Sequence, residues 1–499
     1  MLDVNLIKNL PATIPDFRFK KFDQETYLLT NDLGNYVFLN NQEFEDYISG
    51  RLDSQTAKYQ ELLDNLFIKN ENYVAEFTER FRNRYDFVKY GPSLHIVVVT
   101  LRCNHRCIYC HASAADSTDS GYDMSLGTAK KVVDTIFQSP NWALAIEFQG
   151  GEPILNWPVV KFIIDYATEK NKLEKRNLIF RFVSNFSLLD EEKMNYLLDR
   201  KVNFCTSLDG DEQTHNFNRV FTGANSFALV TEWIKKIGKA YEKRAEGKKK
   251  NYHSVGALMT VSRQTLDNYQ KVIDTYLELG FKSIWLRYLN PFGFALNAQT
   301  KIWYTPQEFI EFYKKSLDYI LEKNYSGQFF YEVFAVTYLR KILLQEEPNH
   351  LDVRSPCGAG IGQLAYNYNG DVYTCDEGRM ISRMDDETFK LGSVLTDSLT
   401  EILSNNACKS VCLASCTETM PGYKDHVYKP YLGVCPVYNY SVHKQIFPAM
   451  KANNRWQIDE AIIDYLFVKL QNQKNKDIFL EWVRRSKPPV RTREEVNSD

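Results

Sequence analysis

Three cysteines in the first half of the chain, Cys103, Cys107 and Cys110, follow one another with the spacing C-x3-C-x2-C. Three thiolates on one short loop can hold three irons of a 4Fe–4S cube and leave the fourth iron open to an outside ligand. A tetrahedral zinc ion would need a fourth protein ligand, for which His105 or His111 is near in the sequence. The spacing favours iron over zinc, and over burial of the three as small hydrophobic residues.

A second group of six cysteines lies between residues 357 and 435. Cys357 and Cys375 stand on either side of the pair Asn369-Gly370, which supplies the positive φ of a tight hairpin turn. Farther on, the spacing i, i+4, i+8 puts three thiols on one helix face, either as metal ligands or as small buried residues. These three are Cys408, Cys412 and Cys416. The isolated Cys205 lies in an apolar segment and is predicted to be inert packing.

The elements that position these cysteines form a repeating pattern over residues 94–291. Apolar runs predict six strands, and amphipathic stretches between them predict helices. The predicted strands are Leu94–Thr100, Leu144–Phe148, Leu178–Val183, Phe204–Leu208, Val255–Val261 and Ile284–Leu289. The predicted helices are Thr128–Gln138, Pro158–Thr168, Asp190–Arg200, Phe227–Tyr241 and Leu266–Leu279. Such alternation indicates parallel βα units, and the continuous apolar runs indicate a sheet buried on both faces. Chemistry in such folds lies on the loops that follow the strands, and the first cysteine group follows the first strand.

The rest of the chain divides by composition. At about 150 residues per domain, 499 residues suggest about three folded units. Residues 1–90 predict a small α+β module with a hairpin and two helices, either a packing appendage or a peptide-docking module. The other predicted units are an α/β domain at 91–300, a helical bridge at 301–355, a loop-rich cysteine domain at 356–445, and helices with a charged tail at 446–499. The basic stretch Lys243–Lys250 is predicted to be a solvated loop.

Charge and hydropathy exclude several classes of function. Lys and Arg number 61 against 63 Asp and Glu, a net charge of −2, so no overall field favours nucleic acid. The apolar runs are far shorter than the roughly 20 residues of a membrane span. The N-terminus does not have the pattern of a signal peptide, so we expect a cytoplasmic chain whose thiols are reduced.

Motifs after successive strands resemble those of the radical S-adenosylmethionine (radical SAM) superfamily. The cysteine loop, with Tyr109 before its last cysteine, matches that family's signature. After the second strand, Gly150, Gly151, Glu152 and Pro153 resemble its GGEP segment. Farther along, Ser184-Asn185, then Ser207 and Asp209 with His215 and Arg219, resemble its later motifs, and Arg287 ends the sixth strand.

The resemblance implies a partial (β/α)6 barrel and a set of cofactor contacts. The GGEP segment would contact the amino group of the methionine moiety, Ser184 and Asn185 the ribose and carboxylate, and Arg219 or Arg287 the carboxylate. The open iron would bind S-adenosylmethionine, and one electron would split it into methionine and a 5′-deoxyadenosyl radical. That radical would remove hydrogen from a substrate C–H bond.

The second cysteine group resembles a SPASM domain, the extension that carries auxiliary iron–sulfur clusters in peptide-modifying radical enzymes. Gly370 to Cys375 gives its G-x4-C segment, but Tyr423, His426 and Leu432 stand where cysteines are expected. The resemblance therefore implies one auxiliary cluster, held by Cys357, Cys375 and Cys435. Its fourth ligand would be Cys408, Cys412 or Cys416, or would be missing. Zinc in place of the cluster is the alternative.

Most of the chain resembles radical SAM/SPASM maturases of the His-Xaa-Ser system. The resemblance implies a ribosomally made precursor peptide as substrate, together with a second radical maturase, a small accessory protein and an external electron donor. Residues 1–90 would help to dock the peptide. Two alternatives remain: a maturase that acts on a folded protein, as in formylglycine formation, and a non-catalytic scaffold that binds the precursor and the second maturase.

Overall fold

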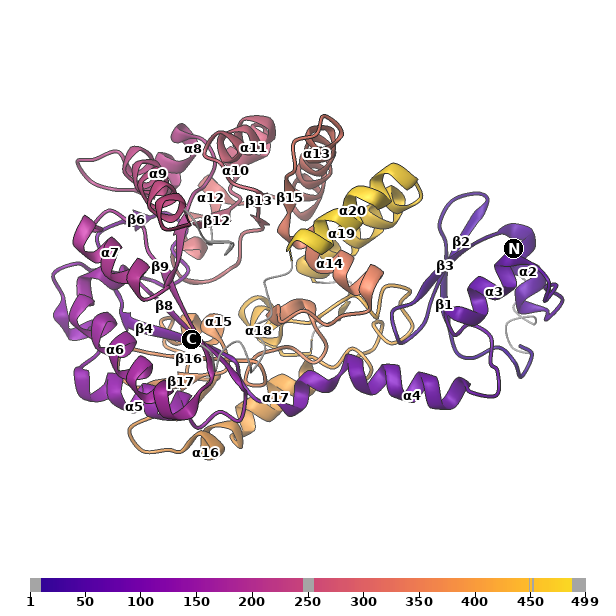
Figure 1. The fold of residues 1–499 in the computed structure, drawn as a ribbon, viewed down its shortest axis with the longest axis horizontal. Helices are drawn as coiled ribbons and strands as arrows, with labels where there is room; N and C mark the ends of the chain where they lie inside the picture. Colours follow the sequence, from indigo (N-terminus) through magenta and orange to yellow (C-terminus); the bar gives the residue numbers. More distant parts are fainter. Residues whose placement is uncertain (1–9, 246–254, 448, 451–452, 487–499) are drawn as a thin grey trace.

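The computed structural model describes residues 10–245, 255–447, 449–450 and 453–486, and its centre is a mixed sheet (Figure 1). The strand order is β14-β12-β10-β9-β8-β4-β16-β17-β18. All pairs from β14 to β16 are parallel, and the last two are antiparallel. The strands are β4 (Leu94–Thr100), β8 (Ala143–Gly150), β9 (Asn177–Val183), β10 (Asn203–Ser207), β12 (Gly256–Thr260), β14 (Leu286–Arg287), β16 (Gln363–Tyr366), β17 (Asp371–Tyr373) and β18 (Lys390–Ser393).

Six of these strands and their connecting helices form the predicted α/β unit with its partial (β/α)6 barrel. The predicted helices appear as α5 (Leu126–Ile136), α6 (Trp157–Glu174), α7 (Glu191–Asp199), α9 (Ser226–Ala245) and α11 (Tyr269–Glu278), with the short α8 (Glu212–Asn218) and α10 (Arg263–Leu266) between them. Their apolar faces share one core with the strands, which includes Val132, Val160, Leu144 and Phe182.

The prediction that the strands are buried on both faces is confirmed for β4, where residues 95–100 are all buried, but is wrong for β8. In β8, Leu144, Ile146 and Phe148 are buried, whereas Glu147 and Gln149 between them are only half-buried and line a cavity. Because side chains alternate along a strand, one face packs on the helices and the other is polar.

The sixth predicted strand is split in two. β13 (Ser283–Ile284) pairs with β15 (Tyr331–Glu332), and β14 pairs with β12. The backbone turns between them, where the Arg287 N–H donates to the Trp285 carbonyl at 2.9 Å. The chain therefore changes pairing partner at Trp285, next to Arg287.

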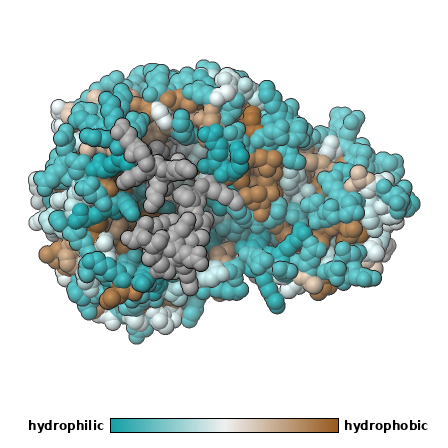
Figure 2. Space-filling view, viewed as in Figure 1, coloured by the Kyte–Doolittle hydropathy of each residue, from teal (hydrophilic) through white to brown (hydrophobic). Residues whose placement is uncertain are grey.

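The N-terminal module has its own core and lies at one end of the molecule (Figure 1). The predicted hairpin and helices are β2 (Thr26–Thr30), β3 (Tyr36–Asn40), α2 (Asn41–Ile48) and α3 (Ala57–Asp64); the sequence analysis missed the edge strand β1 (Arg18–Lys21). Helix α4 (Tyr73–Arg84) leads from the module to the barrel. On the face shown in Figure 2, hydrophilic side chains predominate over both parts.

Arg84, at the end of α4, fastens this module to the rest of the chain. Its guanidinium is buried 2.6 Å from Glu347 and also donates to the carbonyls of Leu33 and Pro430. Since a buried charge is costly without partners, these contacts account for an arginine in the interior.

The C-terminal third contains helices and the cysteine-rich loops. The predicted helical bridge is α13 (Pro306–Tyr325) and α14 (Val333–Leu344), which pack with α19 (Asn454–Leu470) and α20 (Gln473–Ser486). The short helices are α12 (Gln299–Ile302), α15 (Asp376–Ser382), α16 (Leu399–Leu403), α17 (Asn406–Ala414) and α18 (Pro436–His443). Of the predicted basic loop, Lys243 and Arg244 belong to α9. Residues 246–250 and the predicted tail at 487–499 lie outside the described residues.

The predicted hairpin at Asn369-Gly370 is present, and its first strand, β16, also pairs with a strand of the barrel. β16 pairs in parallel with β4, with Gln363 opposite Leu94 and Tyr366 opposite Val97. One sheet thus continues from the barrel into the cysteine-rich region. β4, the strand that leads to the first cysteine group, is therefore the neighbour of β16, the strand that follows Cys357. No helix long and apolar enough to span a membrane occurs in the described part of the chain.

Candidate active site

The first three cysteines lie on the loop that follows β4. The short strands β5 (Arg102–Cys103) and β6 (Arg106–Cys107) belong to this loop, and β6 pairs with β11 (Arg219–Val220). Burial raises the pKa of the Cys103 thiol well above its usual range, and Cys107 and Cys110 raise it further. The three sulfurs are thus within electrostatic range of one another. Burial also raises the pKa of Cys107 to about 12. A positively charged metal partner would stabilise the thiolates and displace their protons to solvent.

The Asp209 carboxylate contacts several predicted site residues next to the cysteine loop. It is fully buried, and the Arg219 Nε lies 3.0 Å from its carboxylate. The Tyr109 hydroxyl and the backbone N–H of Thr260 also donate to this carboxylate. Arg219 is therefore an ion-pair partner of Asp209, a relationship that the sequence did not predict.

Glu152 ties the loop after β8 to the loop after β9. Its carboxylate accepts hydrogen bonds from the Ser184 hydroxyl at 2.8 Å and the Asn185 backbone N–H at 2.8 Å. The side chain of Asn185 extends to Asn104 on the cysteine loop, 3.0 Å away. Burial raises the pKa of Glu152 to about 7. The Glu152 carboxylate is thus hydrogen-bonded to residues of the loop after β9.

Both glycines of the GGEP segment lie against the cysteine loop. A Cβ on Gly150, which has φ +132°, would lie 2.1 Å from the Thr100 carbonyl, and one on Gly151 would lie 2.0 Å from that of Arg102. Pro153 follows, buried, in a short 3-10 turn that ends at Asn156. Only glycine lets the two loops approach this closely.

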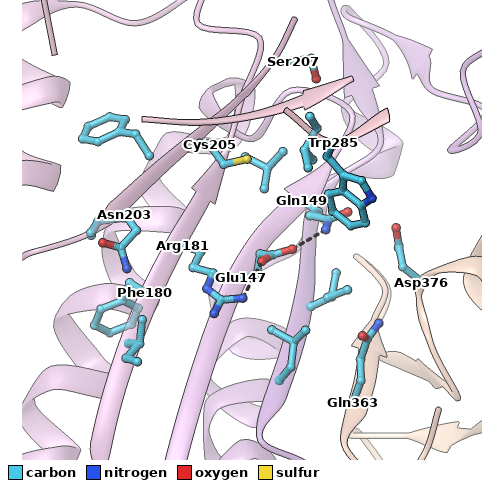
Figure 3. Close-up of a pocket in the computed structure, with 18 of the residues that line it drawn as sticks. Glu147, Gln149, Phe180, Arg181, Asn203, Cys205, Ser207, Trp285, Gln363 and Asp376 are labelled. Atoms are coloured by element: carbon cyan, nitrogen blue, oxygen red, sulfur yellow. Dashed lines mark hydrogen bonds and ion pairs between the residues drawn. The ribbon is translucent and has the colours of Figure 1, made fainter. Parts of the chain in front are cut away.

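A cavity of about 1770 Å³ lies on the polar face of the sheet. Its lining includes Tyr109, Ser207, Arg219 and Arg287, and Figure 3 shows Ser207 near one end of the group of labelled side chains. Cys205, predicted to be inert packing in an apolar segment, lines the same cavity (Figure 3). Along β10, Cys205 and Ser207 are half-buried and line the cavity, whereas the alternate residues Phe204 and Thr206 are buried.

The cavity extends to the cysteine-rich region, where it is lined by residues that the sequence analysis missed. Asp376 and Glu377 directly follow Cys375, and that adjacency was the available signal. Opposite them, the Arg287 guanidinium carbon lies 4.7 Å from the centre of the Trp285 ring. Arg287 thus lines the same cavity as Tyr109, Arg219 and Glu377.

The second set of thiols, Cys357, Cys375 and Cys435, is buried in one small core. Each sulfur accepts a backbone N–H: Ala359 to Cys357 at 3.5 Å, Gly378 to Cys375 at 3.3 Å and Tyr438 to Cys435 at 3.3 Å. The pKa of Cys435 is raised by burial and further by the other two thiols. The three are therefore close together, and N–H groups aimed at sulfur suit thiolate ligands of a metal cluster.

The three cysteines at helical spacing do not share one environment. Cys408 is buried on α17, and a Cβ on Gly360 would lie 2.5 Å from its sulfur. Cys416 lies beyond the end of α17, so the prediction of three thiols on one helix face is wrong for this residue. The turn after α17 touches the second set, because the Ser415 hydroxyl accepts the Cys357 N–H at 2.9 Å. Cys412 is near enough to Cys357 to raise the pKa of that thiol further, beyond the effect of burial.

Side chains fill the places where further cysteines were expected. Tyr423 and Leu432 are 2 % and 1 % exposed and belong to the main core, together with Phe467 of α19. His426 is hydrogen-bonded to Glu460 at 3.1 Å. These positions therefore serve packing and helix attachment.

The donor sets fit iron–sulfur clusters. Among the described residues, no three His, Cys, Asp or Glu side chains are close enough together to hold one metal ion. A cube spreads its ligands over several irons, so its thiolates lie farther apart than those around a single zinc. The first set of three thiols and the second set of three thiols can each provide the thiolate ligands of such a cube.

Two segments match known families. Residues 97–249 match the Radical SAM superfamily, and residues 357–435 match SPASM, described as an iron–sulfur cluster-binding domain. The chain therefore combines a radical SAM domain with a SPASM domain. Its cofactors are those of the two domains, a 4Fe–4S cluster with S-adenosylmethionine and auxiliary iron–sulfur binding.

Particular relatives and structures have similar chains. The radical SAM cyclopropyl synthase TigE of Paramaledivibacter caminithermalis is 21 % identical over 272 residues, 52 % of this chain and 52 % of TigE. A cysteine-type anaerobic sulfatase-maturating enzyme of Clostridium perfringens is 25 % identical over 325 residues, 63 % of this chain and 80 % of that enzyme. The chain thus spans about half the length of TigE.

Two solved structures have the same fold. The structure titled native anSMEcpe with bound AdoMet has a TM-score of 0.62 at 19 % identity, covering 77 % of this chain and 100 % of that one. Streptococcus suis SuiB bound to precursor peptide SuiA has a TM-score of 0.50 at 14 % identity, covering 87 % of this chain and 98 % of SuiB.

Proposed function

We propose that this protein is a radical SAM enzyme that modifies a ribosomally made precursor peptide. The observation that carries the proposal is one cavity that reaches from Tyr109 and Arg219, beside the first thiol set, to Glu377, beside the second. A substrate in that cavity would meet both cofactor sites. The reaction would be a crosslink or another change that starts from a C–H bond.

Cys103, Cys107 and Cys110 would hold the 4Fe–4S cluster. When bound, the cluster would supply the electron that splits S-adenosylmethionine and so gives the radical for hydrogen abstraction. Glu152 holds the Ser184-Asn185 loop at the edge of this site, and Gly150 and Gly151 let the loop after β8 pack against the cysteine loop. Arg287 offers its guanidinium to a carboxylate, because Arg219 already pairs with Asp209.

The second set would hold one auxiliary cluster through Cys357, Cys375 and Cys435. We assign Cys412 as the fourth ligand, because the turn after α17 is hydrogen-bonded to Cys357. Cys408 packs against Gly360, and the Cys416 thiol donates to the Cys412 carbonyl at 3.3 Å.

The peptide would first dock on the N-terminal module. Its three-stranded sheet has an edge at β1, and an extended peptide can add a strand to such an edge. The solved structure of SuiB with a bound precursor peptide, which has a similar fold, supports a peptide substrate. We extend the proposal to the His-Xaa-Ser type of maturase, which works in the cytoplasm with a second radical maturase, a small accessory protein and an electron donor.

A second candidate is the maturation of a folded protein. It is favoured by the similarity to the sulfatase-maturating enzyme of Clostridium perfringens, of which the match covers 80 %. A non-catalytic scaffold is the third, and the intact cysteine loop and GGEP segment weigh against it.

Anaerobic reconstitution with iron and sulfide, followed by an assay for 5′-deoxyadenosine under reductant, tests the proposal. We expect product from the wild type and none from a variant with Cys103, Cys107 and Cys110 changed to Ala. Equal background from both proteins would favour the scaffold. With activity established, a candidate precursor peptide and a sulfatase-derived peptide, compared by mass spectrometry, separate the first two candidates.

A further inference from the structure

The Ser226 hydroxyl lies between two histidines. Its oxygen is 3.0 Å from Nε2 of His105 and 3.0 Å from Nε2 of His215. Ser226 begins α9 and is buried. A hydroxyl has one proton to donate and two lone pairs that accept, so the protonation of each ring decides the direction of its hydrogen bond with Ser226.

The contact at His215 Nδ1 decides the direction at one end. The backbone N–H of Asp209 donates to this atom at 3.3 Å. A backbone N–H cannot accept, so His215 Nδ1 carries no proton. Neutral His215 is therefore protonated at Nε2 and donates to Ser226.

The contact at His105 Nδ1 decides the direction at the other end. This atom is 3.3 Å from Asn104 Oδ1, which also accepts from Asn185 Nδ2 at 3.0 Å. The Asn104 amide nitrogen donates to Ser187, which fixes the orientation of the amide. Since an amide oxygen cannot donate, His105 carries its proton on Nδ1 and accepts from Ser226 at Nε2. The two histidine contacts thus agree: His215 donates to Ser226, and Ser226 donates to His105.

The surroundings keep both rings neutral. His105 and His215 are 3 % and 1 % exposed. A low-dielectric interior of this kind disfavours the charged form of an imidazole. The ring of Phe221 also stacks on His105, with 4.5 Å between the ring centres.

This chain of hydrogen bonds ends at the sulfur of Cys103. The backbone N–H of His105 donates to that sulfur at 3.4 Å, and the Asn185 side-chain nitrogen is 4.0 Å from it. Hydrogen bonds to ligand sulfurs are one of the properties that set the reduction potential of an iron–sulfur cluster.

We propose that Ser226 is a positioning residue for the cysteine loop. It joins His215 to His105 in one directed chain of hydrogen bonds and so holds the two N–H groups that face the Cys103 sulfur. The effect on a cluster rests on the proposed function, whereas the directed chain does not.

Imidazole nitrogen NMR of the cluster-free protein tests the directed chain. We expect opposite neutral tautomers in the wild type, with the proton on Nδ1 of His105 and on Nε2 of His215. Ser226→Ala should alter the signals of both rings, and Ser226→Thr, which keeps the hydroxyl, should restore them. Two rings with the same tautomer, or two rings that Ser226→Ala leaves unchanged, would overturn the inference.

Redox titration followed by electron paramagnetic resonance tests the effect on the reconstituted cluster. Ser226→Ala should shift its midpoint potential to more negative values, because N–H groups near the sulfur lose their support. Thr231→Val on the same helix is the matched control, since that hydroxyl donates only to the Phe227 and Ala228 carbonyls.

A Ser226→Ala potential equal to that of wild type, or a Ser226→Thr variant as shifted as Ser226→Ala, would refute the role. Ser226→Cys, a weaker donor of similar size, replaces the alanine variant if that protein fails to fold. If the wild type binds no iron at Cys103, the proposed function fails while the NMR result still decides the inference.

Discussion

Arg219 lies directly opposite Cys107 across the antiparallel pair of β11 and β6, and its Nη1 is 4.0 Å from the Cys107 sulfur. The same guanidinium pairs with Asp209 at 3.0 Å. One arginine thus links the cysteine loop to the end of β10. Its positive charge lowers the pKa of Cys107, against the larger effect of burial.

Arg219→Ala should destabilise the protein strongly. It leaves the fully buried Asp209 carboxylate without its ion-pair partner, which costs about 3–5 kcal/mol when a buried pair is broken. Thermal unfolding of the cluster-free protein measures the loss, and adding Asp209→Asn should recover part of it. Arg106→Ala is the control, because that pair with Asp116 is exposed and should contribute less than about 1 kcal/mol. Equal unfolding temperatures for Arg219→Ala and Arg106→Ala would contradict the prediction.

Glu152 should make stability depend on pH. Burial raises its folded-state pKa from 4.5 to about 7, so the folded protein holds this proton more tightly than the unfolded chain. The stabilisation is complete below the unfolded pKa and is lost as pH rises through about 7, by about 3 kcal/mol at most. Thermal unfolding of the cluster-free protein should therefore shift to lower temperature between about pH 5 and pH 7.

Glu152→Gln should flatten that pH dependence, because an amide does not titrate. Its baseline stability should also be lower, since an amide N–H₂ would then face the Asn185 backbone N–H. Glu192→Gln, exposed in the first turn of α7, should retain the wild-type slope. If Glu152→Gln has the same slope as wild type, the assigned titration is wrong.

Cys412→Ala should disturb the auxiliary cluster, whereas Cys408→Ala should not. Loss of one thiolate ligand opens an iron, which changes the resonance signals of the reduced cluster and lowers its iron content. Cys408 only packs against Gly360, so its alanine variant should keep wild-type iron and sulfide. The opposite pattern, with Cys408 required and Cys412 dispensable, would overturn the assignment of the fourth ligand.

The protein should hold two iron–sulfur clusters. Anaerobically reconstituted wild type should contain about eight irons per chain, as two cubes require. The buried Tyr423 and Leu432 occupy places where ligands of a third would be expected. Iron and sulfide assays check the number, with the Cys103, Cys107 and Cys110 triple variant expected at about four. About twelve irons in the wild type would show that a third cluster is present.

Much of the barrel could be predicted from the sequence because its strands are local apolar runs. Five of the six predicted strands overlap single observed strands, and the cysteine loop follows β4 as expected. The split at Trp285 could not be predicted, since it depends on pairing with β15, more than forty residues away. The pairing of β16 with β4 joins residues still farther apart and leaves no local signal.

The site was predictable by residue type but less so by role. The spacing of Cys103, Cys107 and Cys110 pointed to one site, yet Arg219 was assigned to a ligand carboxylate and in the structure pairs with Asp209. Partners of this kind are determined by three-dimensional packing. That Cys205 lines the cavity could not be predicted, because an apolar segment does not reveal which alternate side chains face a cavity.

The ladder between β4 and β16 has a mechanical consequence. A main-chain pairing of four successive residues, Leu94 to Val97 against Gln363 to Tyr366, resists hinge bending. The two thiol sets therefore stand on one continuous sheet, and a movement of the cysteine-rich region away from the barrel would have to break this pairing.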